Sequence, residues 1–240
     1  GFLIPLIVLV TPALSDSAVW RGVGLWRAAG HSVLLGGISA VLVVGLSAIM
    51  VLGLGTARPV MRKFLLTFTT LGYAFPGAVL GLGILTPLAL FDNWVADLIY
   101  ATFDLDPGLI LTGSVAALII AYGVRFFAIG VGATEAGLAV ISTNIPLAAR
   151  SLGSPPRSLF LRIYLPLMRG SLASALVLVF VDTVKELPAT LLLRPFNFDT
   201  LSTHIYGQAS LENFNAAAPA ALLIVTLSLG AIFLLAKAHR

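Results

Sequence analysis

Six apolar runs divide the chain, and they constrain its fold more than any other feature of the sequence. The runs cover residues 2–14, 32–55, 64–90, 109–133, 170–192 and 215–236. A helix that crosses the hydrocarbon core of a bilayer needs about 20 mostly apolar residues, and all the runs except the first have that length. The sequence therefore predicts an all-α membrane protein with about six transmembrane helices. The third run contains Pro76 and Gly77, which predict a kink in that helix.

The composition excludes several other classes of protein. Hydrophobic residues make up 59% of the chain and charged residues only 10%, whereas soluble domains carry about 25% charged residues. The absence of cysteine excludes disulfides and thiolate metal sites, and the three histidines form no pair at helical spacing. The phosphate-binding pattern G-x-x-x-x-G-K-[ST] is also absent. We therefore expect that this chain is not an enzyme, does not hydrolyse ATP and binds no cofactor.

The charged residues between the runs fall on alternating sides of the predicted bundle. One set of connections, together with Arg125 near the expected inner end of its helix, contains ten Lys or Arg and one acid. The other set contains three Lys or Arg and seven acids. Because loops rich in Lys and Arg remain in the cytoplasm, the basic side and the C-terminus are predicted to be cytoplasmic. The excess positive charge then orients the protein and contacts lipid headgroups, and no clustered basic patch indicates nucleic-acid binding.

The longest cytoplasmic connection, at about residues 134–169, contains a predicted short helix. Pro146 suits the first turn of this helix, and Gly153 with the prolines after it predicts its end. Ala148 and Ala149 give the helix a small, partly apolar face. Such a helix can dock into a groove on another protein, or it can lie on the membrane surface. The residues by themselves leave both interpretations open.

The spacing around this helix resembles the signature of ABC importer permeases, which reads E-A-A, three residues, G, nine residues, I-x-L-P. Six of the seven defined positions match, and Leu147 replaces the usual Glu. The matching residues are Ala148, Ala149, Gly153, Ile163, Leu165 and Pro166. The resemblance implies a type I ABC importer permease fold with a cytoplasmic coupling helix, which includes Arg150 and seats on a separate ATPase subunit. ATP and Mg would then be bound by that partner.

The fifth run is interrupted by the charged residues Asp182, Lys185 and Glu186, followed by Pro188. Charges inside a membrane span cost roughly 2.5–3.5 kcal/mol each and usually face the bundle interior or an aqueous path. The spacing places the three charges on one broad helix face, where Lys185 neutralises one carboxylate and leaves one net negative charge. Pro188 is expected to bend the helix. The group either fixes helix packing through a salt bridge or lines the translocation path, where negative charge would favour a cation over an anion.

Residues 185–210 resemble the permeases of ferric-iron importers, in which two six-helix halves are often fused in one chain. The resemblance extends over the whole sequence. It implies that residues 1–240 form a single permease domain, one half of a twelve-helix permease. The chain begins at Gly1 within an apolar run, without an initiator Met, and this start resembles that of the second half. We therefore expect that Gly1 is not the native start.

This resemblance implies import of ferric iron across the bacterial cytoplasmic (inner) membrane. The implied partners are a second permease half, nucleotide-binding ATPase subunits and a substrate-binding protein. The binding protein would meet the acidic outer loop at residues 91–106 and the segment at residues 194–213. Fe³⁺ favours oxygen ligands, so Asp182, Glu186 and Tyr206 are candidate transient contacts, with no firm metal site. The alternatives are a permease for thiamine, a phosphonate or a polyamine, and an ion-coupled secondary transporter. A secondary transporter would use the charged group as its relay and would need no coupling helix.

Overall fold

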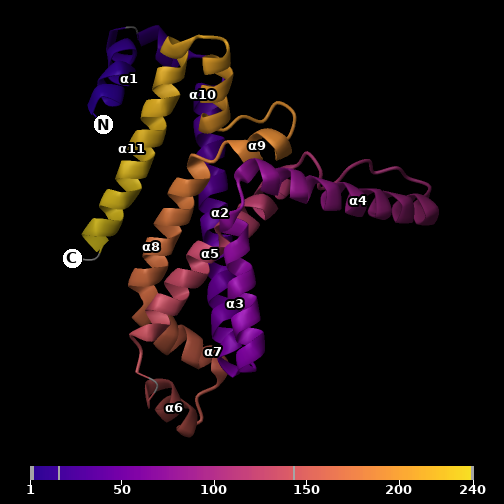
Figure 1. Cartoon of the computed structure of the whole chain (residues 1–240), viewed down its shortest axis with the longest axis vertical. Helices are drawn as coiled ribbons and strands as arrows, with labels where there is room; N and C mark the ends of the chain where they lie inside the picture. Colours follow the sequence, from indigo (N-terminus) through magenta and orange to yellow (C-terminus); the bar gives the residue numbers. More distant parts are fainter. Residues whose placement is uncertain (1–2, 16, 143, 239–240) are drawn as a thin grey trace.

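The computed structural model describes residues 3–15, 17–142 and 144–238, and within these ranges the chain forms helices and no strand (Figure 1). The longer helices are α1 (Leu3–Ser15), α2 (Leu25–Gly53), α3 (Pro59–Ala74), α4 (Gly77–Phe103), α5 (Val115–Ala139), α8 (Leu165–Val184), α10 (Leu201–Ser210) and α11 (Phe214–Ala238). The shorter ones are η1 (Ser17–Arg21), η2 (Leu54–Thr56), α6 (Asn144–Ser151), α7 (Pro156–Leu159), η3 (Phe160–Tyr164) and α9 (Pro188–Leu193). The predicted all-α class is confirmed.

Five helical segments in the described part of the chain are long and apolar enough to cross a membrane. They are Leu25–Gly53, Gly77–Phe103, Val115–Ala139, Arg157–Val184 and Phe214–Lys237. The first predicted run corresponds to α1, which has 13 residues. That length is shorter than the roughly 20 residues of a complete span.

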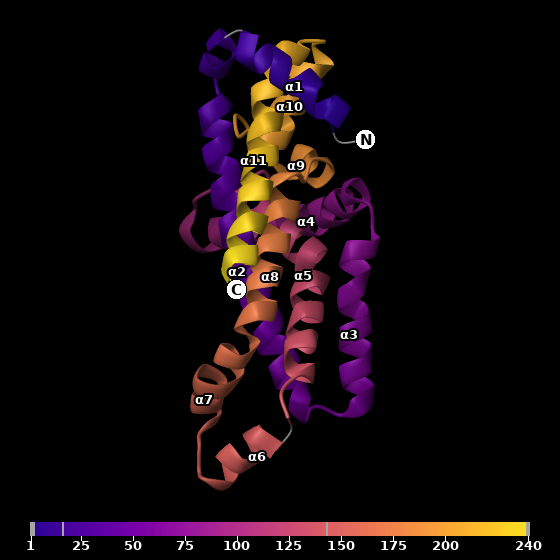
Figure 2. The same ribbon diagram turned by 90° about the vertical axis from the view of Figure 1, so that its left-hand side faces the viewer.

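Three long helices, α2, α5 and α8, pack against one another and form the centre of the molecule (Figures 1 and 2). α3 lies against α5, and α11 lies against α8, α10 and α1. At one end of the long axis lie η1 and α10, and at the opposite end lies α6 (Figure 1). α4 runs across this axis and projects sideways from the bundle (Figure 1). The segment predicted to couple the protein to its ATPase therefore lies at the end opposite α10.

A buried apolar core and close approach at small residues hold the central helices together. Leu35 of α2 and Val179 of α8 are at most 1% exposed and belong to one continuous apolar core. Gly130 of α5 lies so near α2 that a Cβ on it would come within 2.3 Å of Ser47 Oγ. Because lipid tails are as apolar as these side chains, membrane helices associate through close van der Waals contact instead of expulsion of water.

The third predicted span is two helices instead of one kinked helix. α3 ends at Ala74 and α4 begins at Gly77, and both Phe75 and Pro76 are extended with ψ of 140°. The cause is Pro76, because its ring disfavours the helical conformation at Phe75 and its nitrogen has no hydrogen to donate. The prediction of one kinked helix was therefore wrong. The helix is interrupted at this break, and α4 runs across the direction of α3 (Figure 1).

α4 extends to Phe103, so most of the expected outer loop at residues 91–106 is helical. Asp92 lies on this helix and its side chain is fully buried. It accepts hydrogen bonds from the backbone N–H groups of Leu111 at 2.9 Å and Thr112 at 2.6 Å. This carboxylate therefore ties the segment between α4 and α5 back onto α4.

Replacing Asp92 by asparagine is expected to loosen this segment without changing the bundle. An amide has one acceptor oxygen and no charge, so it cannot hold both N–H groups as the carboxylate does. Amide hydrogen exchange at Leu111 and Thr112 is expected to accelerate by about tenfold or more. Asp97→Asn, at an exposed position on the same helix, is the matched control and should leave the exchange rates unchanged. Equal rates in both variants would contradict this role for Asp92.

The fifth predicted span is also divided. α8 ends with Lys185 as its C-cap, and Pro188 begins the separate helix α9. Pro188 thus occupies the first turn of a helix, where its missing N–H is not needed, instead of bending a longer helix. Glu186 lies between the two helices. The prediction that it shares one helix face with Asp182 and Lys185 is therefore wrong.

Candidate functional site

α6 is the outermost element at its end of the molecule (Figures 1 and 2). It begins at Asn144, slightly before the predicted start at Pro146. Gly153 follows the helix with φ of 77°, and the N–H of Ser154 donates to the carbonyl of Ala149 at 3.0 Å. This arrangement is a Schellman-type helix end, which needs a residue that tolerates positive φ. The predicted short helix is present with its glycine stop.

The remaining residues of the motif extend from α6 to the start of α8. Ala148 is exposed and Ala149 is half-buried, while the side chain of Arg150 lies outside the described residues. Ile163 belongs to the π-helical turn η3, and Leu165 begins α8. π-helical turns are rare and occur frequently at functional sites. The motif therefore covers an exposed small-residue face and the irregular turn that leads into α8.

The charged residues of the fifth run belong to two separate ion pairs. Lys185 Nζ lies 2.7 Å from Asp182 Oδ1, and the side chains are 58% and 19% exposed, respectively. The predicted neutralisation of one carboxylate by Lys185 is thus confirmed. Because both residues belong to α8 and its C-cap, this pair links no separate elements.

The second ion pair joins Glu186 to Arg125, which lies near the middle of α5 instead of at its inner end. Arg125 Nε is 3.0 Å from Glu186 Oε2, and the side chains are 19% and 7% exposed. The Nε–H has no aligned hydrogen-bond acceptor in the described structure, so the contact is electrostatic. The fifth run alone carries one net negative charge, but Arg125 from α5 balances it, so the predicted net negative charge in the membrane is wrong. A lone arginine within the fourth apolar run was the sequence signal for this partner.

The Arg125–Glu186 pair lies where the two helix breaks meet. Arg125 Nη1 donates at 3.0 Å to the carbonyl of Phe75, at the break between α3 and α4. A Cβ on Gly77 would come within 2.5 Å of Glu186 Oε1, so the first residue of α4 lies directly against this carboxylate. The same oxygen accepts a hydrogen bond from the N–H of Ala189 in α9 at 3.3 Å. One ion pair therefore contacts α5 and the starts of α4 and α9.

Buried hydroxyl groups fix the backbone of the α8–α9 break. The carbonyl of Glu186 accepts hydrogen bonds from Thr190 Oγ1 at 2.7 Å and from Ser202 Oγ at 2.8 Å. The hydroxyl of Tyr122 on α5 and that of Thr190 are also 2.7 Å apart and hydrogen-bonded. These contacts satisfy polar groups that would be costly to leave unpaired inside a membrane protein. The break is therefore a defined joint between α5, α8, α9 and α10.

The candidate contacts for a ferric ion do not come together as a metal site. Asp182 and Glu186 are each paired with a cation, and Tyr206 lies exposed on α10. Within the described residues, no group of three or more His, Asp or Glu side chains is arranged to hold a metal ion. The role of these residues as transient contacts therefore stays a prediction.

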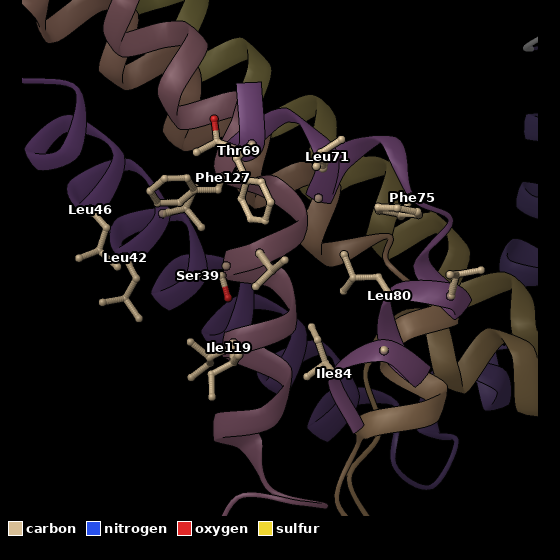
Figure 3. A pocket seen from close by; sticks show the side chains of 18 residues that line it. Ser39, Leu42, Leu46, Thr69, Leu71, Phe75, Leu80, Ile84, Ile119 and Phe127 are labelled. Carbon is tan, nitrogen blue, oxygen red and sulfur yellow. The ribbon is translucent and has the colours of Figure 1, made fainter. Parts of the chain in front are cut away.

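A cavity of about 770 Å³ lies between α2, α3, α4 and α5 (Figure 3). Each helix contributes large apolar side chains, and Ser39 and Thr69 are the only polar side chains among the described residues that line it. Ser39 Oγ is buried and has no hydrogen-bond partner in the described structure. This lining suits an apolar group and offers no charge to hold an ion.

Proteins with similar sequences are membrane components of transport systems. The chain is 33% identical over 165 residues to the Fe(3+)-transport system permease protein FbpB 2 of Haemophilus influenzae, which covers 69% of this chain and 29% of that protein. It is 26% identical over 244 residues to the putative 2-aminoethylphosphonate transport system permease protein PhnV of Salmonella typhimurium, covering 95% of this chain and 85% of that protein. The chain therefore spans less than a third of the length of the iron-transport relative.

Two solved structures share the fold. A chain of the bacterial alginate ABC transporter, in complex with an alginate pentasaccharide-bound periplasmic protein, matches with a TM-score of 0.80 and 17% identity, over 100% of this chain and 88% of that chain. The MetNI methionine ABC transporter in an inward-facing conformation matches with a TM-score of 0.62 and 13% identity, over 89% of this chain and 92% of that chain. The predicted type I importer permease fold is confirmed.

The family described as binding-protein-dependent transport system inner membrane components matches residues 49–239. The matched region includes both helix breaks, α6 and the complete motif around it. The family consists of membrane permeases, not of the ATPases themselves. The chain therefore belongs to the binding-protein-dependent inner membrane components, as a permease subunit of an ABC importer.

Proposed function

We propose that α6 is the coupling helix of this permease and that it transmits the motion of a separate ATPase, which binds ATP and Mg, to the membrane helices. The observation that carries the proposal is the exposed small-residue face of α6, ended by Gly153, at one tip of the molecule. Small side chains such as Ala148 let another protein approach the helix closely. An ion-coupled secondary transporter has no need for such a protruding helix.

The surface of α4 supports assembly with a second permease half. Trp94, Leu98 and Phe103 on this helix are 62%, 54% and 68% exposed, although they are large and apolar. α4 projects from the bundle (Figure 1), and the rest of the chain leaves more than half of each of these side chains uncovered. Large exposed apolar surfaces mark contacts with another protein or with lipid. A second six-helix half, fused or separate, would bury this surface and complete the translocation path.

The proposed orientation places α6 and the C-terminus on the cytoplasmic side of the bacterial inner membrane. α11 runs from the α10 end of the molecule toward the α6 end (Figure 1). Arg58 lies in the connection between α2 and α3, and Arg62 lies in the first turn of α3. The positive-inside rule expects basic residues of this kind on the cytoplasmic side. The substrate-binding protein would then approach the opposite end, near α10.

For the cargo we propose ferric iron, delivered by the substrate-binding protein. The support is the 33% identity to the Fe(3+)-transport permease of Haemophilus influenzae. The 26% identity to a putative 2-aminoethylphosphonate permease makes a phosphonate the second candidate. Because Arg125 of α5 balances the net negative charge of the fifth run, these two ion pairs together favour neither a cation nor an anion.

Uptake in proteoliposomes tests the proposed function and its cargo. The complete permease is reconstituted with its ATPase and binding protein, and ATP-dependent uptake of radiolabelled Fe³⁺ is compared with uptake of 2-aminoethylphosphonate. We expect uptake of iron. Ala148→Trp is expected to lower uptake and co-purification of the ATPase by about tenfold or more, because a large ring blocks close approach to α6.

The matched control is Val140→Trp, which adds the same ring at an exposed position between α5 and α6. This variant is expected to retain the ATPase and full uptake. Uptake of the phosphonate but not of iron would overturn the cargo and keep the importer mechanism. Full coupling in the Ala148→Trp variant would overturn the role of α6.

A further inference from the structure

We propose that Arg125 and Glu186 are positioning residues that latch the α3–α4 break to the α8–α9 break, so that displacement of α6 reaches α4 and α9 as one movement. This inference rests on the proposed coupling role of α6. It assigns a function to a buried ion pair that belongs neither to the coupling motif nor to a binding site for the cargo. We call the two residues the latch.

The order of the elements gives the latch its mechanical position. α6 comes after α5 in the chain and leads through α7 and η3 into α8. A movement of α6 therefore acts on α5 and α8 together. The latch connects these same two helices at a distance from α6, because Arg125 lies in the middle of α5 and Glu186 directly follows the end of α8.

The two breaks are the places where this movement can change direction. Phe75 and Pro76 are extended between α3 and α4, and Glu186 lies between α8 and α9. Residues at the ends of helices absorb the changes in backbone angles during hinge motions. α4 and α9 pack against each other beyond the breaks. A joint that holds both breaks thus controls α4 and α9 as a pair.

The contacts of the latch reach every element of this joint. Arg125 donates to the Phe75 carbonyl at 3.0 Å and lies 3.0 Å from the Glu186 carboxylate. Glu186 in turn accepts from the N–H of Ala189 in α9 and lies against Gly77, the first residue of α4. Removing the pair would leave α4 joined to α5 only by weaker packing. The breaks would then bend independently.

Stability alone is a poor reason for this pair. A buried ion pair costs desolvation energy, and its replacement by apolar residues is often neutral or stabilising. Arg62 and Glu135 form a second ion pair that joins α3 to α5, but it is exposed and lies away from the breaks. Both pairs use a residue of α5, but Arg62–Glu135 joins α5 to α3, whereas Arg125–Glu186 joins it to the α8–α9 break, and only the second pair lies at the hinges. This difference supplies a matched control.

The test uses the complete permease with its ATPase and loaded binding protein in lipid nanodiscs and proteoliposomes. The latch is removed in the double variant Arg125→Met/Glu186→Leu, which leaves no unpaired charge and is expected to fold. Spin labels are attached through Leu90→Cys on α4 and Leu178→Cys on α8, both at exposed positions in a chain without native cysteine. The readouts are cargo moved per ATP and the change in label distance on ATP binding.

With the latch intact, we expect ATP binding to shift the label distance to a second, narrow distribution. In the double variant we expect a broad distribution that does not shift, and a loss of cargo moved per ATP of about tenfold or more. ATP hydrolysis itself should persist, because α6 is unchanged. The control Arg62→Gln/Glu135→Gln should remain within about twofold of the unmodified permease, because exposed ion pairs contribute little.

A double variant that folds and keeps both the distance shift and the cargo moved per ATP would overturn the latch. The same loss in the Arg62→Gln/Glu135→Gln control would also overturn it, since the loss of any ion pair on α5, even one away from the breaks, would then have this effect. The failure of the proposed function looks different. In that case the unmodified permease would show no ATP hydrolysis stimulated by a loaded binding protein, and the latch would lose its role in transport with it.

Discussion

Gly72→Ala is expected to separate α3 from α5 and to leave little correctly folded permease. A Cβ on Gly72 would come within 2.1 Å of the carbonyl oxygen of Val124 and 3.0 Å of its carbonyl carbon. The obstacle is backbone, so no side-chain rotation relieves the clash, and the helices must move apart. Overpacking of a core costs about 1–3 kcal/mol even where side chains can adjust. This substitution should lie at the upper end of that range or beyond it.

The measurement is the fraction of permease that remains monodisperse after heating in detergent, followed by size-exclusion chromatography. Gly123→Ala is the matched control, because Gly123 adjoins Val124 on α5 and a Cβ there meets nothing within 4 Å. An alanine in open space on a helix is expected to stabilise it by up to about 1 kcal/mol. Equal heat resistance of the two variants would show that α3 does not pack on α5 at this position.

Glu186→Leu is expected to destabilise the permease more than the double variant Arg125→Met/Glu186→Leu does. The single substitution leaves the guanidinium of Arg125 charged, four-fifths buried and without its carboxylate partner. Removing one partner of a buried ion pair typically costs about 3–5 kcal/mol, whereas replacing both is often nearly neutral. The double variant still loses the hydrogen bonds to Phe75 and from Ala189, so it should lie between the single variant and the unmodified chain.

The unfolding temperatures of the purified variants, measured in the same detergent, give this order of stability directly. The control is Lys185→Gln, which breaks the more exposed pair with Asp182 and should have a much smaller effect on the unfolding temperature. If Glu186→Leu were as stable as the double variant, the charge of Arg125 would have another partner in the membrane. The electrostatic role of the pair would then be disproved.

The all-α membrane class and the short helix at α6 could be predicted from local properties of the sequence. Apolar runs of about 20 residues have few other stable arrangements, because backbone polar groups in lipid must be satisfied within a helix. The helix end at Gly153 was equally local, since a positive φ favours glycine at that position. Both features depend on neighbours in the chain and not on the packing of distant segments.

The prolines in the sequence indicated where the two helices are disturbed, but not how. Pro76 and Pro188 each disfavour a continuous helix, yet a proline can kink a helix or begin a new one. The contacts of the residue after each proline decide between these outcomes. Gly77 packs against Glu186, and Ala189 donates to the same carboxylate, so both new helices begin where distant residues meet.

The net charge around the α8–α9 break was decided only by the tertiary structure. Lys185 and Asp182 are three residues apart, so helix geometry was enough to predict their pairing. Arg125 and Glu186 lie in different helices, and no local periodicity relates them. Proximity in the sequence determined the first pair, whereas the second exists because α5 passes the point at which both breaks meet. The charges of residues 182–186 alone predicted a negative region, whereas Arg125 of the neighbouring helix α5 makes this joint neutral.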